Sequence, residues 1–197
     1  MSTVIGPVRF SYCSIFEPRS IGTSDPKYSI TMLIPKSDTQ LVANIRAAMD
    51  VAKQAGLSKK FNGQMPVHPA LPIHDGDGQR PNGEDFGDEC RGHYVMTATT
   101  NDKYPPRVVA GQDRHPVTDQ SEVYSGCYGY VSVNFAAYNF NGKKGIGCYL
   151  NNVFKTKDGE PLGGTRSNAK DDFANIQVDT DDAFAEPEDD SFDAIFG

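Results

Sequence analysis

Hydrophobic and polar residues alternate along several short stretches of this chain, and a period of two is typical of half-buried β-strands. The clearest alternation runs through residues 127–138, where valines lie on one face and tyrosines on the other. The sequence NFNGKKG then supplies the turn residues of a hairpin, and residues 146–155 follow as the antiparallel partner. Asn151 and Asn152 interrupt the alternation of that partner, which predicts a β-bulge or a polar edge.

The N-terminal segment, residues 4–12, shows the same alternation in the sequence VIGPVRFSY. Its predicted core face consists of Val4, Gly6, Val8, Phe10 and Tyr12. Pro7 cannot donate a hydrogen bond to a neighbouring strand, so it indicates an edge strand or a bulge. Residues 28–35 predict a second strand, with alternate apolar side chains on one face and an end at Pro35.

A helical pattern covers residues 37–56. Ser37 and Gln40 have the spacing of a capping box, apolar residues recur every three to four positions, and Gly56 fits the C-terminal stop. Residues 57–92 lack periodicity and are rich in Gly, Pro, Asp and Asn, which predicts a long loop that is functional or mobile.

The strand pattern returns at residues 92–101 and 107–111, so the chain predicts five or more short strands around one helix. No β-α-β rhythm is present, and a parallel nucleotide-binding sheet is therefore not expected. The pattern favours a mainly β fold. A small Greek-key β-barrel with one α-helix and long loops accounts for it, and an OB-fold is such a barrel.

The net charge of −7 is unevenly distributed along the chain. Residues 171–197 hold ten acidic residues and no Lys or Arg, which leaves residues 1–170 with a net charge of +3. We therefore expect one folded domain over residues 1–170 and a disordered acidic tail over residues 171–197. A basic body joined to an acidic tail indicates a body that binds polyanions and a tail that contacts partners.

The cysteines are far apart and form no C-x-x-C pair, so we predict buried structural thiols rather than disulfides or a zinc site. They are Cys13, Cys90, Cys127 and Cys148. No stretch approaches the ~20 apolar residues of a membrane span, and the first residues do not resemble a secretory signal. We expect a cytoplasmic protein that has no membrane partner and needs no cofactor.

Candidate catalytic residues are confined to one acidic stretch. The sequence HDGDG, which contains Asp75 and Asp77, resembles a calcium loop but has Phe86 where the twelfth position needs an acid. Nucleotide-binding, hydrolase and zinc-protease motifs are absent from the sequence. A metal-dependent nuclease that uses the carboxylates of residues 74–88 stays an alternative, and so does an adaptor or structural protein that does not bind DNA.

Basic and aromatic residues are interleaved along residues 1–170, as in RGHY, NDKYPPR and NFNGKKGIGCY. Binding of single strands without sequence preference needs cations for the phosphates and aromatic faces for the bases. The predicted DNA-binding residues are Arg9, Lys27, Arg91, Lys103, Arg107, Tyr128, Tyr130, Tyr138, Lys143 and Lys144. We expect Phe10, Tyr12, Phe135 and Phe154, in contrast, to be half-buried core residues.

Several motifs together resemble one known family. VRFSYCSIFEP, PKYSITMLIPKSD, HDGDGQRP, SEVYSGCYGYVSVNFAAYN and GIGCYLNNVFKTKDGEPLGG follow one another over residues 4–173. They are similar to a family of tailed-phage single-stranded-DNA-binding proteins that have an OB-fold. The resemblance implies a non-enzymatic role in coating DNA during phage replication or recombination.

The acidic tail contains aromatic residues, which a tail that served only solubility would not need. The predicted partner-binding residues are Asp189, Asp190, Phe192, Asp193 and Phe196. We expect the acids to compete with DNA for the basic body, and the phenylalanines to dock on replication or recombination proteins. The tail resembles the acidic tips of bacterial single-strand binding proteins, which end in Phe. Because Gly197 follows Phe196 here, host partners are disfavoured and a phage-encoded partner stays open.

Overall fold

A computed structural model of the chain describes residues 2–20, 22 and 24–162. Its elements are β1 (Ser2–Arg19), β2 (Lys27–Pro35), α1 (Thr39–Gly56), β3 (Ile73–Asp75), the 3₁₀ helix η1 (Asp88–Cys90), β4 (His93–Asn101), β5 (Arg107–Ala110), β6 (His115–Pro116), the 3₁₀ helix η2 (Gln120–Glu122), β7 (Tyr128–Phe140) and β8 (Lys143–Lys157). The predicted tail and its boundary at residue 170 lie outside the described residues. Within the described ranges, no helix is both long and apolar enough to cross a membrane.

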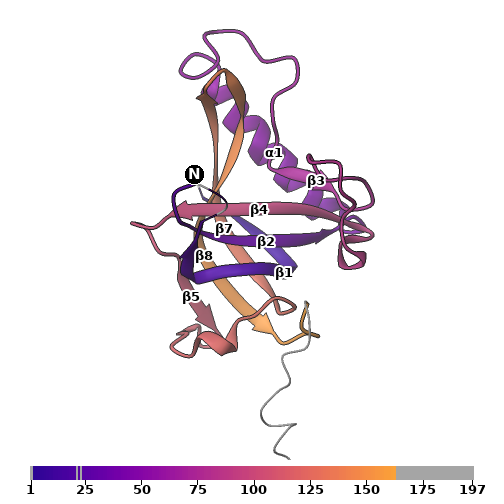
Figure 1. Ribbon diagram of the computed structural model, residues 1–197, viewed down its shortest axis with the longest axis vertical. Helices are drawn as coiled ribbons and strands as arrows, with labels where there is room; N and C mark the ends of the chain where they lie inside the picture. The colour runs from indigo at the N-terminus through magenta and orange to yellow at the C-terminus, as the bar shows by residue number, and fades with distance from the viewer. Residues whose placement is uncertain (1, 21, 23, 163–197) are drawn as a thin grey trace, which may run out of the picture. The chain divides into compact units, whose positions relative to one another are not determined.

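Five strands close into a barrel. β1 pairs antiparallel with both β2 and β7, β2 pairs with β4, and β7 pairs with β8. The circle closes where Thr99 of β4 lies parallel to Tyr149 of β8. Figure 1 shows β1, β2 and β4 side by side across the front, with β7 and β8 behind them. This strand order is that of an OB-fold, and the predicted mainly β fold with one α-helix is confirmed.

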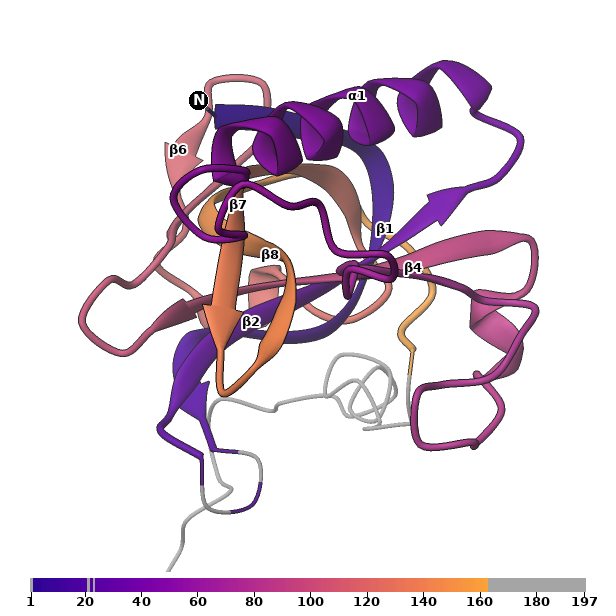
Figure 2. The same ribbon diagram turned by 90° about the horizontal axis from the view of Figure 1, so that it is seen from above.

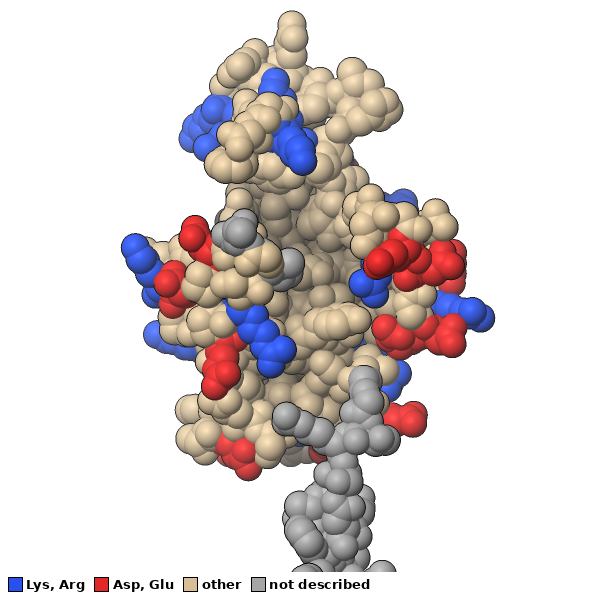
Figure 3. Space-filling model, viewed as in Figure 1, with Lys and Arg blue, Asp and Glu red and all other residues tan. Residues whose placement is uncertain are grey.

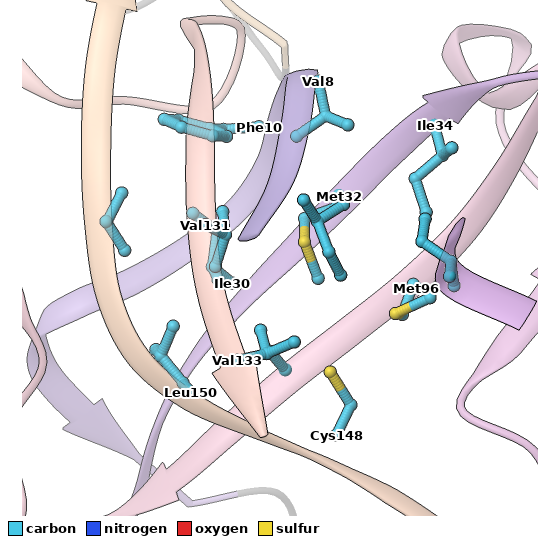
Figure 4. Packing of buried hydrophobic residues seen from close by; sticks show 14 of the residues in the cluster. Val8, Phe10, Ile30, Met32, Ile34, Met96, Val131, Val133, Cys148 and Leu150 are labelled. Carbon is cyan, nitrogen blue, oxygen red and sulfur yellow. The ribbon is translucent and has the colours of Figure 1, made fainter. Parts of the chain in front are cut away.

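Apolar side chains from all five barrel strands fill the interior. Figure 4 shows these side chains pointing toward one another between the strands. Among them are Phe10, Met32, Met96, Val131 and Leu150, one from each strand and all buried. Burial of one such side chain contributes about 1.5–3 kcal/mol. The interior therefore supplies much of the free energy that favours closure of the barrel.

β1 contains a β-bulge at Pro7, as the sequence predicts. The register between β1 and β7 shifts between Ile5 and Val8. Ile5 is consequently buried, whereas Val4 is 64% exposed. The predicted place of Val4 on the core face is therefore wrong, because a bulge adds one residue and exchanges the two faces of the strand.

A second irregularity in β1 moves Tyr12 out of the core. The register between β1 and β2 shifts between Ser11 and Ser14. Tyr12 lies in this bulge with a φ of 45°, and it is 63% exposed. The prediction that Tyr12 is a half-buried core residue is wrong, since strict alternation does not hold across a bulge.

α1 covers part of the core and begins one residue later than the capping pattern suggests. The Asp38 carboxylate accepts a hydrogen bond from the Leu41 amide at 3.0 Å. The predicted capping box of Ser37 and Gln40 is therefore wrong, because the helix starts at Thr39 and its N-cap is Asp38. The predicted apolar stripe joins the barrel core. Figure 2 shows α1 beside β7, against which it packs.

The β7–β8 hairpin forms as the sequence predicts. Asn141 and Gly142 both have positive φ angles, 49° and 78°, as a two-residue type I′ turn requires. The predicted bulge is also confirmed, because the register between the strands shifts after Ser132 and leaves Asn151 without a paired residue.

We expect Gly56→Ala to lower the free energy of unfolding. A Cβ atom on Gly56 would overlap the Cβ atom of Ala137. Such overpacking costs about 1–3 kcal/mol, whereas replacing Gly by Ala in a helix contributes at most about 1 kcal/mol. Urea denaturation measures the net change in the free energy of unfolding. Gly56→Ala/Ala137→Gly should recover part of the loss, and a gain in stability for Gly56→Ala alone would contradict the close packing.

Candidate nucleic-acid interface

The outer face of β1, β2 and β4 has a floor of small hydroxyl side chains. These residues alternate with core residues such as Ile30 and Ala98, so they point away from the barrel interior. The register aligns them in two rows, Ser11–Thr31–Thr97 and Ser14–Ser29–Thr99, and we call these six residues the hydroxyl face. The two threonine hydroxyl oxygens of the first row are 2.9 Å apart. Short side chains allow a polymer backbone to approach the sheet closely.

The loop of residues 76–92 packs on the outside of the same sheet, next to the hydroxyl face. Leu33 and Val95 occupy the neighbouring row and point outward, yet both are buried. They pack with Cys90 and Phe86 of the loop in a small apolar cluster of their own. The predicted irregular loop is thus anchored on the sheet and forms a wall beside the hydroxyl face.

Tyr12 and Arg80 meet at the border of the hydroxyl face. The Arg80 guanidinium lies 5.3 Å from the centre of the Phe86 ring. Hydrogen bonding to the Tyr12 side chain raises the pKa of Arg80. Arg80 Nε is buried and has no hydrogen-bond partner among the residues that the structure describes. An exposed ring beside a cation is the combination that single-strand binding uses.

The charges of this side of the molecule lie around the hydroxyl face. In Figure 3, acidic and basic side chains gather on both flanks, and the surface between them is hollowed and carries neither. Lys and Arg gather at the top of the same view, where Figure 1 places the tip of the β7–β8 hairpin. A neutral floor between flanks of mixed charge, with a basic cluster at the hairpin tip, leaves room for an anionic strand that carries flat bases.

The ten predicted DNA-binding residues do not share one groove. On the outer face of β1, β5, β7 and β8 lie Arg9, Arg107, Tyr128 and Tyr130. Near the tip of the hairpin lie Tyr138, Lys143 and Lys144. At the end of β2 and in the turn that follows β4 lie Lys27 and Lys103. Arg91 follows η1 and pairs with Asp88 at 3.0 Å.

The hairpin tip concentrates positive charge. The Asn139 side chain donates a hydrogen bond to the Lys60 carbonyl at 3.2 Å, which fixes the end of the hairpin beside the residues that follow α1. Lys60 and Lys143 are exposed there, and Phe140 is 72% exposed. The tip therefore presents cations and one exposed ring.

The acidic stretch behind the nuclease alternative is engaged in ion pairs. Lys36 Nζ contacts the carboxylates of both Asp75 and Asp77, the latter at 2.6 Å. Its hydrogen bonds lower the pKa of both carboxyl groups. In the described part of the chain, no three His, Cys, Asp or Glu side chains lie close enough together to hold a metal ion. The geometry therefore gives the nuclease alternative no support.

The four cysteines are free thiols, and three of them are buried. Burial raises the pKa of the Cys148 thiol to about 12, so it stays protonated near neutral pH. The prediction of structural thiols is confirmed for Cys90, Cys127 and Cys148.

Sequence reasoning missed Tyr12 and Arg80. Alternation places Tyr12 on the core face. The bulge that exposes this residue depends on pairing with β2, which alternation does not reveal. Arg80 lies in the aperiodic sequence DGQRPNG, where no local pattern indicates a contact with β1. The available signals are the basic and aromatic residues of RFSY and the single basic residue of GQRP, and both are weak.

Comparisons with known proteins place the chain in one family. The sequence model described as "Enterobacter phage Enc34, ssDNA-binding protein" matches residues 1–184. Putative protein p50 of Acyrthosiphon pisum secondary endosymbiont phage 1 is 26% identical over 185 residues, which are 90% of this chain and 95% of that protein.

Solved structures agree with this placement. The single-stranded DNA-binding protein from bacteriophage Enc34, in complex with ssDNA, has a TM-score of 0.70 and 28% identity over 82% of this chain and 89% of that chain. The gp2.5 single-stranded DNA binding protein of bacteriophage T7 has a TM-score of 0.56 over 94% of this chain and 98% of that chain, and its 16% identity shows a likeness of fold alone. As the motifs predicted, the chain belongs to the family of the single-stranded-DNA-binding protein of Enterobacter phage Enc34.

Proposed function

We propose that this chain binds single-stranded DNA with little sequence preference and without catalysing a reaction. The observation that carries the proposal is the family match over residues 1–184, supported by the fold that the chain shares with a relative solved in complex with ssDNA. The setting is phage DNA replication or recombination in the host cytoplasm. This proposed function agrees with the DNA-coating role that the sequence motifs predict.

We place the DNA strand on the hydroxyl face. OB-folds bind oligonucleotides on the face of their second and third barrel strands and on the flanking loops. These strands are β2 and β4 here. The hydroxyl groups of Ser14, Ser29, Thr97 and Thr99, the members of the hydroxyl face that are not buried, suit phosphate oxygens. The exposed Tyr12 ring suits a base. Every base has a π face, so stacking contributes about 1–3 kcal/mol per base without selecting a sequence.

Cations at the borders of the hydroxyl face follow the phosphate backbone. Arg80 stands beside Tyr12 and over the Phe86 ring. Lys27, the first residue of β2, and Lys103, in the turn after β4, are exposed, and Lys103 precedes Tyr104, which is 69% exposed. Lys143 and Lys144 extend the positive surface at the hairpin tip.

The acidic tail is proposed to compete with DNA for this surface. Leu162, the last described residue, packs with Leu33 and Val95 on the outer face of β2 and β4. The ten acids of residues 171–197 follow in the sequence, beginning nine residues after Leu162. A short tether gives them an effective concentration on the order of millimolar. A long DNA strand displaces the tail. Phe192 and Phe196 of the displaced tail then dock on a partner protein.

We expect Tyr12→Ala to weaken binding of dT and mixed-sequence strands alike, by about 1–3 kcal/mol or roughly 5- to 150-fold in Kd. Tyr12→Phe keeps the ring and should bind nearly as well as the unaltered chain. Fluorescence anisotropy with a labelled strand of about 30 nucleotides, longer than one OB-fold covers, measures both affinities. Thermal denaturation checks that both variants fold, and an unchanged Kd for Tyr12→Ala would exclude stacking on this ring.

Lys143→Ala tests the hairpin tip through salt dependence. Loss of one phosphate contact should reduce the slope of log Kobs against log[salt] by about 0.7–1. Lys53→Ala is the matched control, because Lys53 lies on α1 and pairs with Asp50 at 2.8 Å. Equal slopes for the two variants would remove Lys143 from the DNA path.

Removal of residues 171–197 should strengthen single-strand binding, most of all at low salt, where attraction between the acidic tail and the cations is least screened. Anisotropy at two salt concentrations compares the full chain with residues 1–170. Replacing Asp189, Asp190 and Asp193 by Asn in the full chain should produce part of the gain, whereas Phe192→Ala should not. Equal affinities would contradict competition by the tail, and absence of binding by every form would favour the adaptor alternative.

A further inference from the structure

A second outer face of the barrel combines aromatic rings with cations. It spans β1, β7, β8 and β5, and its residues alternate with the buried Val131 and Val153. Its members are Arg9, Arg107, Arg114, Tyr128, Tyr130, Phe154 and Lys157, and we call them the aromatic–cation face. Of these four strands, only β1 also belongs to the hydroxyl face, which otherwise uses β2 and β4.

Cations lie over the rings in both rows of the aromatic–cation face. The Arg9 guanidinium is 5.7 Å and the Lys157 ammonium 6.0 Å from the centre of the Tyr128 ring. In the adjacent row, the rings of Tyr130 and Phe154 stack with centroids 6.1 Å apart and planes 22° apart. Arg114 lies 5.5 Å from the centre of the Phe154 ring.

These cations are available to an anionic ligand. Among the ion pairs between described residues, none involves Arg9, Arg114 or Lys157. The carboxylate that follows Lys157, Asp158, already pairs with Lys155 at 2.8 Å. A depression of about 420 Å³ lies beside Tyr128 and is lined by both of its cations and by residues 156–160.

β1 connects this face with the hydroxyl face. Arg9 is in register with Leu33 of β2 on one side and with Tyr128 of β7 on the other. Its guanidinium donates hydrogen bonds to the carbonyl oxygens of Glu160 at 2.7 Å and Gly126 at 3.4 Å, which hold it in place. In the sheet, β1 alone separates β2 of the hydroxyl face from Tyr128 of β7.

We propose that a single DNA strand continues from the hydroxyl face across β1 onto the aromatic–cation face, so that the protein covers a longer stretch of DNA than the hydroxyl face alone. The inference rests on the proposed function. Rings and cations occur here in adjacent rows, the combination that an unpaired nucleotide strand needs. An acidic peptide uses the cations but needs fewer rings, so the composition of the face favours DNA.

The test uses the full chain and strands of two lengths. Lys157→Ala/Arg114→Ala removes two cations from the aromatic–cation face, and Arg46→Ala/Lys53→Ala removes the same charges from α1 as the matched control. Labelled dT strands of about 8 and about 30 nucleotides, one within and one beyond the 4–16 nucleotides that an OB-fold covers, are kept in excess over protein. Anisotropy at several salt concentrations measures Kd and the salt slope for each combination of protein variant and strand length.

We expect the first double variant to bind the short strand like the unaltered chain and the long strand about 10-fold more weakly, with a salt slope lower by about 1.4 for two lost phosphate contacts. The control should change neither. The same effect on both strand lengths, or no effect, would overturn the inference while the short-strand affinity still supports the proposed function. Absence of short-strand binding by the unaltered chain would instead reject the proposed function itself.

A labelled peptide of residues 183–197 tests whether an acidic peptide, rather than DNA, occupies the aromatic–cation face. DNA as the occupant predicts that the first double variant and the control bind this peptide equally. Loss of peptide binding together with intact long-strand binding would assign the face to an acidic peptide and overturn the inference.

Discussion

The parallel pairing of β4 with β8 at Thr99 and Tyr149 is the contact on which the rest of the structure depends. It closes the circle of five barrel strands, whose other four pairings are all antiparallel. Closure removes exposed strand edges there and encloses the apolar interior. Once the barrel is closed, every strand has one face in the core and one face outside. The hydroxyl face and the aromatic–cation face are both consequences of that division.

β1 gives the two outer faces a common border. It is the strand that pairs with both β2 and β7, and its register shifts allow one segment to follow the curvature of the barrel. The bulge that exposes Tyr12 also gives this residue a positive φ, a conformation that non-glycine residues adopt at some energetic cost. The packing of the surrounding strands maintains that conformation, and the ring is thereby presented beside Arg80.

Charge and apolar packing are divided among different parts of the molecule. The apolar residues close the barrel and anchor the loop of residues 76–92, so the outer faces are free to carry hydroxyl, aromatic and basic groups. Lys36 pairs with Asp75 and Asp77 where this loop begins, which helps to hold the loop as a wall beside the hydroxyl face. The unbalanced acids lie in residues 171–197, and Leu162 fixes the preceding chain next to the hydroxyl face.

Residues close together in the sequence determined the strands β2, β7 and β8, the helix α1, the Asn141–Gly142 turn and the uneven charge, because alternation, turn chemistry and composition are local properties. Only the tertiary structure decided which side chains share a face. The exposure of Tyr12 depends on register with β2, and its contact with Arg80 depends on how a distant loop packs against the sheet. The ten predicted DNA-binding residues are divided among separate surfaces for the same reason, since barrel closure sets the direction in which each strand faces.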